Sequence, residues 1–246
     1  MTGPMRRSFA KLEGSLKELP KQLAITPKAV LVVSGHWETR EFAVMSNAHP
    51  PMVYDYSGFP EELYHIRYPA PGAPERAVQV EAMLKQAGLP TRLDDKQGFD
   101  HGTFSMLAVM YPDADIPILQ VSMRSGYDPA EHLALGRVLA PLRDEGVLII
   151  GSGYSYHNFH PHDPERESTE FDAWLKQTLV DSEPARRTER LLHWDQAPSA
   201  RAAHPREDHL VPLFVAVGAA EQEAGQQIYR EEKVFGTITA SSYRFG

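Results

Sequence analysis

The chain has 246 residues, 42% of them hydrophobic and 24% charged, which is ordinary for a soluble globular protein and suits one large domain better than two small ones. Its formal net charge of -8 offers no basic surface for nucleic acid, and no run of Lys or Arg indicates a membrane-binding patch. Cysteine is absent, which excludes disulfides and thiol nucleophiles, and no stretch approaches the roughly 20 apolar residues of a membrane span. Because the N-terminus also lacks the apolar segment of a secretory signal, we expect a cytoplasmic protein.

The first predicted elements are a helix, a buried strand and a long loop. Apolar residues at helical spacing predict a helix over 5–18, and Pro20 ends the pattern. The continuous apolar run 29–37 is typical of a strand buried on both faces, as in a parallel sheet. Residues 45–73 are rich in Pro, Gly and aromatic side chains and predict a long loop. Loops of this length in compact domains are commonly functional.

Strands and helices then alternate to the C-terminus. The patterns predict a helix at 74–88, strands near 91–93 and at 116–123, a helix at 129–144, a strand at 146–153, helices near 167–181 and 207–220, and one or two antiparallel strands in the tail. This alternation predicts an α/β fold. We expect a single domain with a mixed, largely parallel central sheet and helices on both faces.

Histidine is the unusual residue, with 11 in the chain, and two of them follow predicted buried strands. His36 ends the run 29–37, and His157 lies in the loop after 146–153. Ligands of open α/β sheets bind at the carboxyl ends of the strands, so these imidazoles could share a metal. Alternatively, each could be a polar strand-end residue hydrogen-bonded to the backbone. For either histidine alone, that second interpretation is favoured.

Two more histidines stand near predicted helix starts. His101 lies in GFDHGTF, where flanking glycines permit close ligand approach and where Asp100 or Thr103 could cap a helix. His209 lies in the first turn predicted for the helix 207–220, from which its ring could point at a strand-edge site.

Other histidines and aromatic residues have weaker signals. His65 lies in the aromatic loop and could line a substrate pocket. Tyr64 and the other tyrosines of this loop could form an aromatic wall or simply pin the loop to the core. His160 and His162 could form a surface metal site, although a solvated loop is the favoured interpretation.

Seven motifs occur in an order that resembles one family. They are SGHW (34–37), GFPEELYHIRYPAPG (58–72), GFDHG (98–102), YPDADIPILQVS (111–122), LRDEGVLIIGSG (142–153), YHN (156–158) and EDHLVPL (207–213). Together they resemble the DOPA 4,5-dioxygenase branch of the LigB-like, class III extradiol dioxygenases. The resemblance covers nearly the whole chain, and the order of the motifs is more specific than any one of them.

The resemblance implies a metal-dependent oxidoreductase that cleaves a catechol ring with O2. His36 and His209 match metal ligands, and His157 matches a position described either as a ligand or as the catalytic base. His101 matches a second active-site histidine that hydrogen-bonds substrate or oxygen. His65 and Tyr64 are the expected substrate-binding residues. The cofactor would be one divalent metal, Fe(II) for turnover or Zn(II) as bound, and no oligomeric state is implied.

The chain departs from the family pattern at its start. The family begins with a strand that carries a further ligand histidine, whereas no histidine precedes His36 here. We therefore expect residues 1–246 to form a single catalytic domain that is N-terminally incomplete, through a late start assignment or a real truncation. Such a domain should expose a sheet edge or an apolar groove. The alternatives are a non-oxygenase, Memo-like binding module of the same fold and a hydrolase using a metal-bound water.

Overall fold

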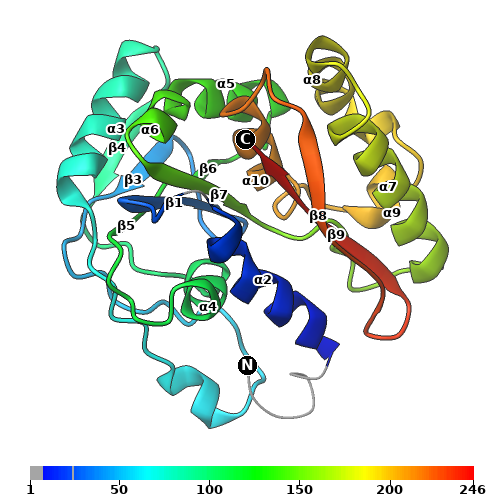
Figure 1. The fold of residues 1–246 in the computed structure, drawn as a ribbon, viewed down its shortest axis with the longest axis horizontal. Coiled ribbons are helices and arrows are strands. Elements are labelled where there is room, and N and C mark those ends of the chain that lie inside the picture. Colours follow the sequence, from blue (N-terminus) through cyan, green and yellow to red (C-terminus); the bar gives the residue numbers. More distant parts are fainter. Residues whose placement is uncertain (1–7, 24) are drawn as a thin grey trace.

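The computed structural model describes residues 8–23 and 25–246. At its centre lies a three-stranded parallel sheet in the order β5-β1-β7, formed by Ile118–Gln120, Ala29–Ser34 and Val147–Ser152 (Figure 1). Every residue of β1 is buried, which accounts for the apolar run that precedes Ser34. Three of the predicted strands therefore lie side by side in one parallel sheet.

Further strand pairs extend this arrangement. The parallel pairs are β2 (Glu38–Thr39) with β6 (Met123–Arg124) and β3 (Phe42–Met45) with β4 (Thr91–Asp94). The tail forms an antiparallel hairpin of β8 (Gly225–Val234) and β9 (Ile238–Phe245). The α/β fold with mixed, largely parallel strands is thus confirmed.

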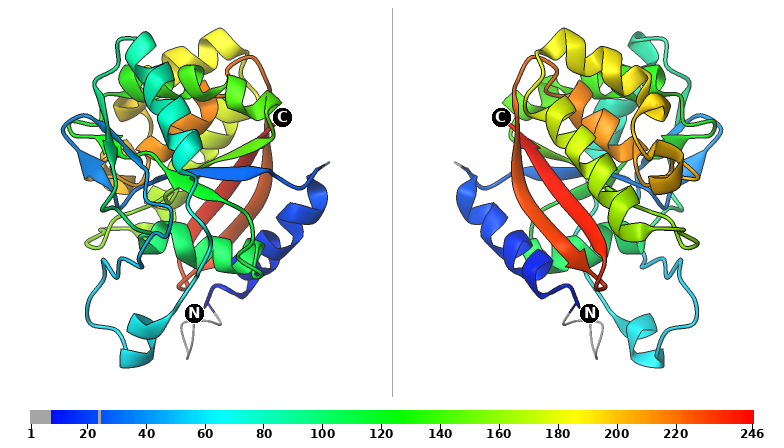
Figure 2. Two further views of the ribbon diagram at one scale, coloured as in Figure 1. Left: turned by 90° about the vertical axis from the view of Figure 1, so that its left-hand side faces the viewer. Right: turned by 90° about the vertical axis from the view of Figure 1, so that its right-hand side faces the viewer.

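Helices cover both faces of the central sheet (Figure 2). The helices are α2 (Ala10–Gln22), η1 (Glu61–His65), α3 (Pro74–Gln86), α4 (His101–Met110), α5 (Pro129–Leu139), α6 (Pro141–Asp144), α7 (Pro164–Leu179), α8 (Pro184–Leu192), η2 (Trp194–Gln196), α9 (Ala200–Ala203) and α10 (Val211–Gly218). Val30 and Val32 of β1 belong to the core cluster that includes α4, whereas Leu31 and Val33 belong to the cluster of α3, α5 and α10. Within the described chain, no helix combines the length and apolarity needed to cross a membrane.

Prolines account for two differences from the predicted helices. Helix α2 continues through Pro20 to Gln22, although Pro20 has no N–H to donate to the carbonyl of Leu16, and the helix ends two residues later. Residues 5–7 of that prediction lie outside the described residues. The helix predicted at 129–144 is two helices, since Pro141 cannot donate a backbone hydrogen bond and begins α6.

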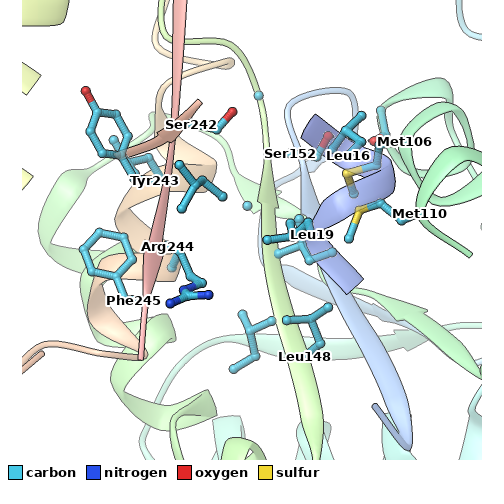
Figure 3. A pocket seen from close by; sticks show the side chains of 18 of the residues that line it. Leu16, Leu19, Met106, Met110, Leu148, Ser152, Ser242, Tyr243, Arg244 and Phe245 are labelled. Carbon is cyan, nitrogen blue, oxygen red and sulfur yellow. Dashed lines mark hydrogen bonds between the residues drawn. The ribbon is translucent and has the colours of Figure 1, made fainter. Parts of the chain in front are cut away.

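A groove runs along one edge of β7 (Figure 3). This strand pairs with β1, and no described residue pairs with its other edge. A cavity of about 2110 Å³ lies there, with Leu19 and Met110 on one side and Tyr243 and Phe245 of β9 on another. The unpaired edge of β7 therefore faces this groove, and the N-terminal incompleteness of the domain stays a prediction.

Candidate metal centre and active site

Four histidines meet where β1 and β7 end. Nε2 of His36 lies 3.1 Å from Nε2 of His209. The ring of His101 has its centroid 3.9 Å from that of His36, and the ring of His157 stacks on His209 at 3.5 Å. All four line the cavity beside β7. The structure therefore brings together the histidines singled out in the sequence, while the role of each stays a prediction.

Two glycines permit this convergence. A Cβ atom on Gly35, just after β1, would lie 3.0 Å from the backbone oxygen of Asp208. One on Gly153, just after β7, would lie 2.1 Å from the backbone oxygen of His209. That oxygen accepts a hydrogen bond from the amide of Tyr154 at 3.0 Å. Both strand ends thus approach the segment before α10 closely, and this approach brings His209 beside His36.

Asp55 is a site residue that the sequence interpretation missed. Its Oδ1 lies 2.9 Å from Nδ1 of His101 and accepts the backbone N–H of His101 at 3.0 Å. Its Oδ2 lies 3.0 Å from Nδ1 of His36. Burial alone would raise the pKa of Asp55, but the hydrogen bonds from His101 and His36 outweigh burial and hold this pKa far below its ordinary value. Asp55 is therefore an ionised acceptor between two imidazoles.

A second carboxylate, Asp100, anchors the start of α4. It caps the helix by accepting a hydrogen bond from the amide of Thr103 at 3.0 Å, and it is one of the two capping residues that the sequence allowed. It also accepts hydrogen bonds from the hydroxyl of Ser34 at 2.7 Å and from Nε2 of Gln120 at 2.8 Å. Burial raises its pKa, and the hydrogen bonds from Ser34 and Gln120 oppose that effect. This buried network ties the end of β1 and the strand β5 to the helix that begins at His101.

His157 occupies a different position from His36. It is half-buried and stacks on His209 with 16° between the ring planes, and its Nδ1 lies 3.9 Å from Oδ1 of Asp208, beyond hydrogen-bonding distance. Burial, and then the neighbouring His209, lower the pKa of His157 to about 4. The ring is thus neutral at pH 7 and able to accept a proton.

The pair His36 and His209 fits a divalent metal. Two nitrogens 3.1 Å apart can both lie about 2.0–2.1 Å from one ion, because their separation is less than twice that distance. Oδ2 of Asp55 lies 3.0 Å from Nδ1 of His36, and metal-binding imidazoles usually have such a partner, which fixes the tautomer. Oδ1 of Asp208 lies 3.2 Å from Nδ1 of His209, but it accepts the backbone N–H of His209, and this Nδ1 makes no hydrogen bond within the described residues. Two groups of potential ligand atoms result, His36–Asp55–His101 and His157–Asp208–His209.

The two predicted substrate-binding residues, Tyr64 and His65, contact other residues of their own loop. The side chain of His65 is 69% exposed and pairs with Glu61, so its position does not favour substrate contact. Tyr64 contacts Tyr56, whose ring in turn lies 5.3 Å from that of His101. Tyr56 is therefore the loop tyrosine beside the histidines, and it had no distinguishing signal among its aromatic neighbours.

The loop after His157 presents its histidines to solvent. His160 and His162 are both exposed, and the amide of His160 bonds to Asn158. Neither residue belongs to a potential metal-binding group within the described residues. This agrees with the favoured interpretation of a solvated loop.

Known proteins share the sequence and the fold. Residues 3–246 match the family model described as the catalytic LigB subunit of aromatic ring-opening dioxygenase. The 4,5-DOPA dioxygenase extradiol of Beta vulgaris is 39% identical over 226 residues, covering 89% of this chain and 83% of that protein. The protein of the same name from Escherichia coli (strain K12) is 35% identical over 227 residues, with the same two shares. The crystal structure of an uncharacterized Escherichia coli K12 protein, JW3007, has a TM-score of 0.78 at 32% identity and covers 95% of this chain and 92% of its own.

Proposed function

Since the chain belongs to the LigB family of aromatic ring-opening dioxygenases, we propose that it is an extradiol dioxygenase that opens a catechol ring with O2. The observation that carries the proposal is the approach of Nε2 of His36 to Nε2 of His209 within a cavity that also contains His101 and His157. The substrate class would be catechols such as DOPA, because relatives are named for that activity. These names do not favour the alternatives of a non-oxygenase binding module or a hydrolase.

His36 and His209 would hold the metal, Fe(II) for turnover or Zn(II) as bound. Imidazole nitrogen suits both ions. When bound, Fe(II) would supply redox chemistry and open positions for the catechol oxygens and O2. His157, the remaining predicted ligand, shares a group of potential ligand atoms with Asp208 and His209 but stacks on the face of His209 with 16° between the ring planes. The in-plane lone pairs of two nearly parallel rings do not converge on one ion. The position of His157 therefore supports a role beside the metal better than one as a principal ligand.

His157 would act as the general base. A catechol hydroxyl bound beside His36 and His209 must lose a proton, and a neutral imidazole can accept it. The lowered pKa of His157 keeps the ring neutral, and the stacked ring of His209 holds it in place. The proton would pass from the catechol oxygen to an imidazole nitrogen of His157.

His101 would orient the substrate. Its Nδ1 is engaged by Asp55, so Nε2 is the atom left for hydrogen bonding to substrate or oxygen. Tyr56 lies edge-on to this ring at 5.3 Å and supplies an apolar surface for an aromatic substrate. The ring of Tyr64 packs against that of Tyr56, with centroids 5.2 Å apart. Direct contact of Tyr64 or His65 with the catechol stays a prediction.

The test is oxygen consumption under defined metal loading. Metal-free protein is loaded anaerobically with Fe(II), and O2 uptake and ring opening are followed with DOPA, caffeate and unsubstituted catechol. We expect one O2 consumed per ring opened, and no reaction with a phenol that lacks the second hydroxyl. Product formation without O2, or no reaction with any catechol while the protein retains iron, would contradict the proposed function.

A further inference from the structure

Asp55 contacts two of the four histidines through separate carboxylate oxygens. Oδ2 lies 3.0 Å from Nδ1 of His36, and Oδ1 lies 2.9 Å from Nδ1 of His101. The backbone N–H of His101 donates to the same Oδ1 at 3.0 Å. One side chain therefore fixes two rings whose centroids are only 3.9 Å apart.

An ionised carboxylate can only accept hydrogen bonds, so both imidazoles must carry their proton at Nδ1. The lone pair of each ring is then at Nε2. For His36 this is the atom that lies 3.1 Å from Nε2 of His209. Building on the proposed function, we propose that Asp55 is the positioning residue that sets the metal-binding tautomer of His36 and the substrate-facing tautomer of His101 together.

The loop that carries Asp55 is fastened to the strand-like segment before α4. The amide of Val53 donates to the carbonyl of Phe99 at 2.8 Å, and the amide of Phe99 donates to Pro51 at 2.8 Å. Met52 and Phe99 form a parallel bridge. Because the two paired segments run parallel, Asp55 lies beside His101 shortly after the bridge.

The same loop provides the aromatic wall. Tyr56 follows Asp55 directly and lies 5.3 Å from His101, while Tyr54 packs edge-on against Phe104 of α4. The hydroxyl of Tyr54 also donates to the carbonyl of Ile66 at 2.6 Å, which closes the loop on itself. The position of the substrate wall and the tautomer of a metal ligand therefore depend on one loop.

The substitution Asp55→Asn tests this inference with minimal change of shape. The backbone N–H of His101 cannot become an acceptor, so the amide oxygen of Asn must stay on the His101 side. The amide NH2 group would then face Nδ1 of His36, which must become an acceptor and move its proton to Nε2. His36 could not then bind a metal in that orientation. We expect zinc affinity to fall by about 10–100-fold, the usual effect of losing such a partner.

Two measurements follow the substitution. Calorimetric titration of metal-free protein with Zn(II) gives the affinity, and nitrogen-15 NMR of the histidine side chains gives the tautomers without any metal. The wild type should show the proton of His36 and His101 at Nδ1. The Asp55→Asn variant should show His36 protonated at Nε2 and His101 unchanged.

Two further variants control for shape and fold. Asp55→Glu keeps two acceptor oxygens, so it should retain the Nδ1 tautomers and bind Zn(II) more tightly than Asp55→Asn. Asp94→Asn removes a carboxylate that accepts the amides of Lys96 and Gln97 outside the histidine cluster, and it should bind Zn(II) like the wild type. Thermal unfolding of each variant shows whether it is folded.

The inference is overturned if Asp55→Asn binds Zn(II) within threefold of wild type, or if His36 keeps its proton at Nδ1 in that variant. The inference would also be overturned if the Asn and Glu variants lost Zn(II) affinity equally while the histidine tautomers stayed unchanged. The proposed function fails separately, if iron-loaded wild type consumes no O2 with catechols. The zinc and NMR results do not depend on that reaction.

Discussion

The rings of His157 and His209 lie face to face, with centroids 3.5 Å apart and 16° between their planes. Only His209 turns its Nε2 toward Nε2 of His36, at 3.1 Å. Burial and the nearby His209 both lower the pKa of His157, to about 4, so the His157 ring is neutral at pH 7. The arrangement divides the pair into one ring that faces His36 and one neutral ring beside it.

This division predicts different outcomes for two alanine variants. His157→Ala should lower turnover by about 10²–10⁴-fold, the typical contribution of a general base, while metal affinity stays within a few-fold of wild type. His36→Ala should lose most of the bound metal. Metal content after dialysis and kcat with a catechol, measured on the same samples, separate the two effects.

The exposed His162 supplies the control for both variants. His162→Ala should leave metal content and kcat unchanged. If His157→Ala loses as much metal as His36→Ala, His157 is primarily a ligand and the base must be sought elsewhere.

Asp100 gives a prediction about stability. Asp100→Ala removes the cap of α4 and leaves Ser34 and Gln120 without their buried partner, which should cost about 2–4 kcal/mol in the free energy of unfolding. Asp100→Asn should cost less than about 1 kcal/mol. The reason is that Oε1 of Gln120 is buried without a partner among the described residues, and rotation of the Gln120 amide would let it accept from the new NH2 group.

Urea unfolding of the two Asp100 variants at pH 7 measures the difference. Equal destabilisation by Asn and Ala would mean that the negative charge, rather than the hydrogen bonds, holds the start of α4.

Gly153 marks a place where the backbone tolerates no side chain. In Gly153→Ala the new methyl group would lie 2.1 Å from the backbone oxygen of His209, so β7 and the segment before α10 must separate. We expect a loss of about 1–3 kcal/mol in stability and weaker Zn(II) binding.

Gly14 of α2 is the matched control, because nothing lies within 4 Å of a Cβ atom there. Gly14→Ala should stabilise the helix by about 0.4–1 kcal/mol. If the Gly153→Ala variant is as stable as wild type and binds Zn(II) fully, the close approach of Gly153 to the backbone of His209 is contradicted.

Two buried histidines, His132 and His204, predict that the folded protein loses stability in acid. Burial lowers the pKa of His132 to about 4 and that of His204 to about 3. As the pH falls below the ordinary value near 6.5, the unfolded chain takes up these protons and the folded protein does not. Stability from these groups is therefore present above pH 6.5 and is lost toward pH 4, at about 1.4 kcal/mol per pH unit for each histidine.

The variant His132→Gln isolates one of these contributions. Its free energy of unfolding, measured from pH 6 to pH 4.5, should decline less steeply than that of wild type by about 1.4 kcal/mol per pH unit. Carboxylates titrate in both proteins and cancel in this difference. Parallel curves would mean that His132 is protonated in the folded state.

The sequence predicted the parts of the fold that have local causes. The apolar runs of β1 and β7 predicted two strands, and histidines follow at the strand ends; β1 is fully buried, whereas only Val147 of β7 is. The cap at Asp100 was visible for the same local reason. The division of 129–144 was missed because Pro141 begins a second helix inside one apolar pattern, and the four-residue α9 is too short to show a period. The helix α8 was missed although it is amphipathic and begins at Pro184.

Asp55 shows why part of the site was not predictable. Nothing near it in the sequence marks it as a partner of histidines 19 residues earlier and 46 residues later. Its role depends on the pairing of Val53 with Phe99, which is a long-range contact without a pattern of its own. His36 and His101 could be found from their strand and helix positions, whereas the residue that joins them could not.

The groove along β7 has a consequence for hydrogen exchange. The amide of Gly35 donates to the carbonyl of Ser152, which together with the register of the two strands fixes which residues of β7 face β1. Those residues are Leu148, Ile150 and Ser152, and the ones that face the groove are Val147, Ile149 and Gly151. We expect the second set of amides to exchange with solvent much faster than the first, although all six belong to one strand beside the core. By its composition β7 is an interior strand, and its exchange pattern should be that of a strand at the rim of a sheet.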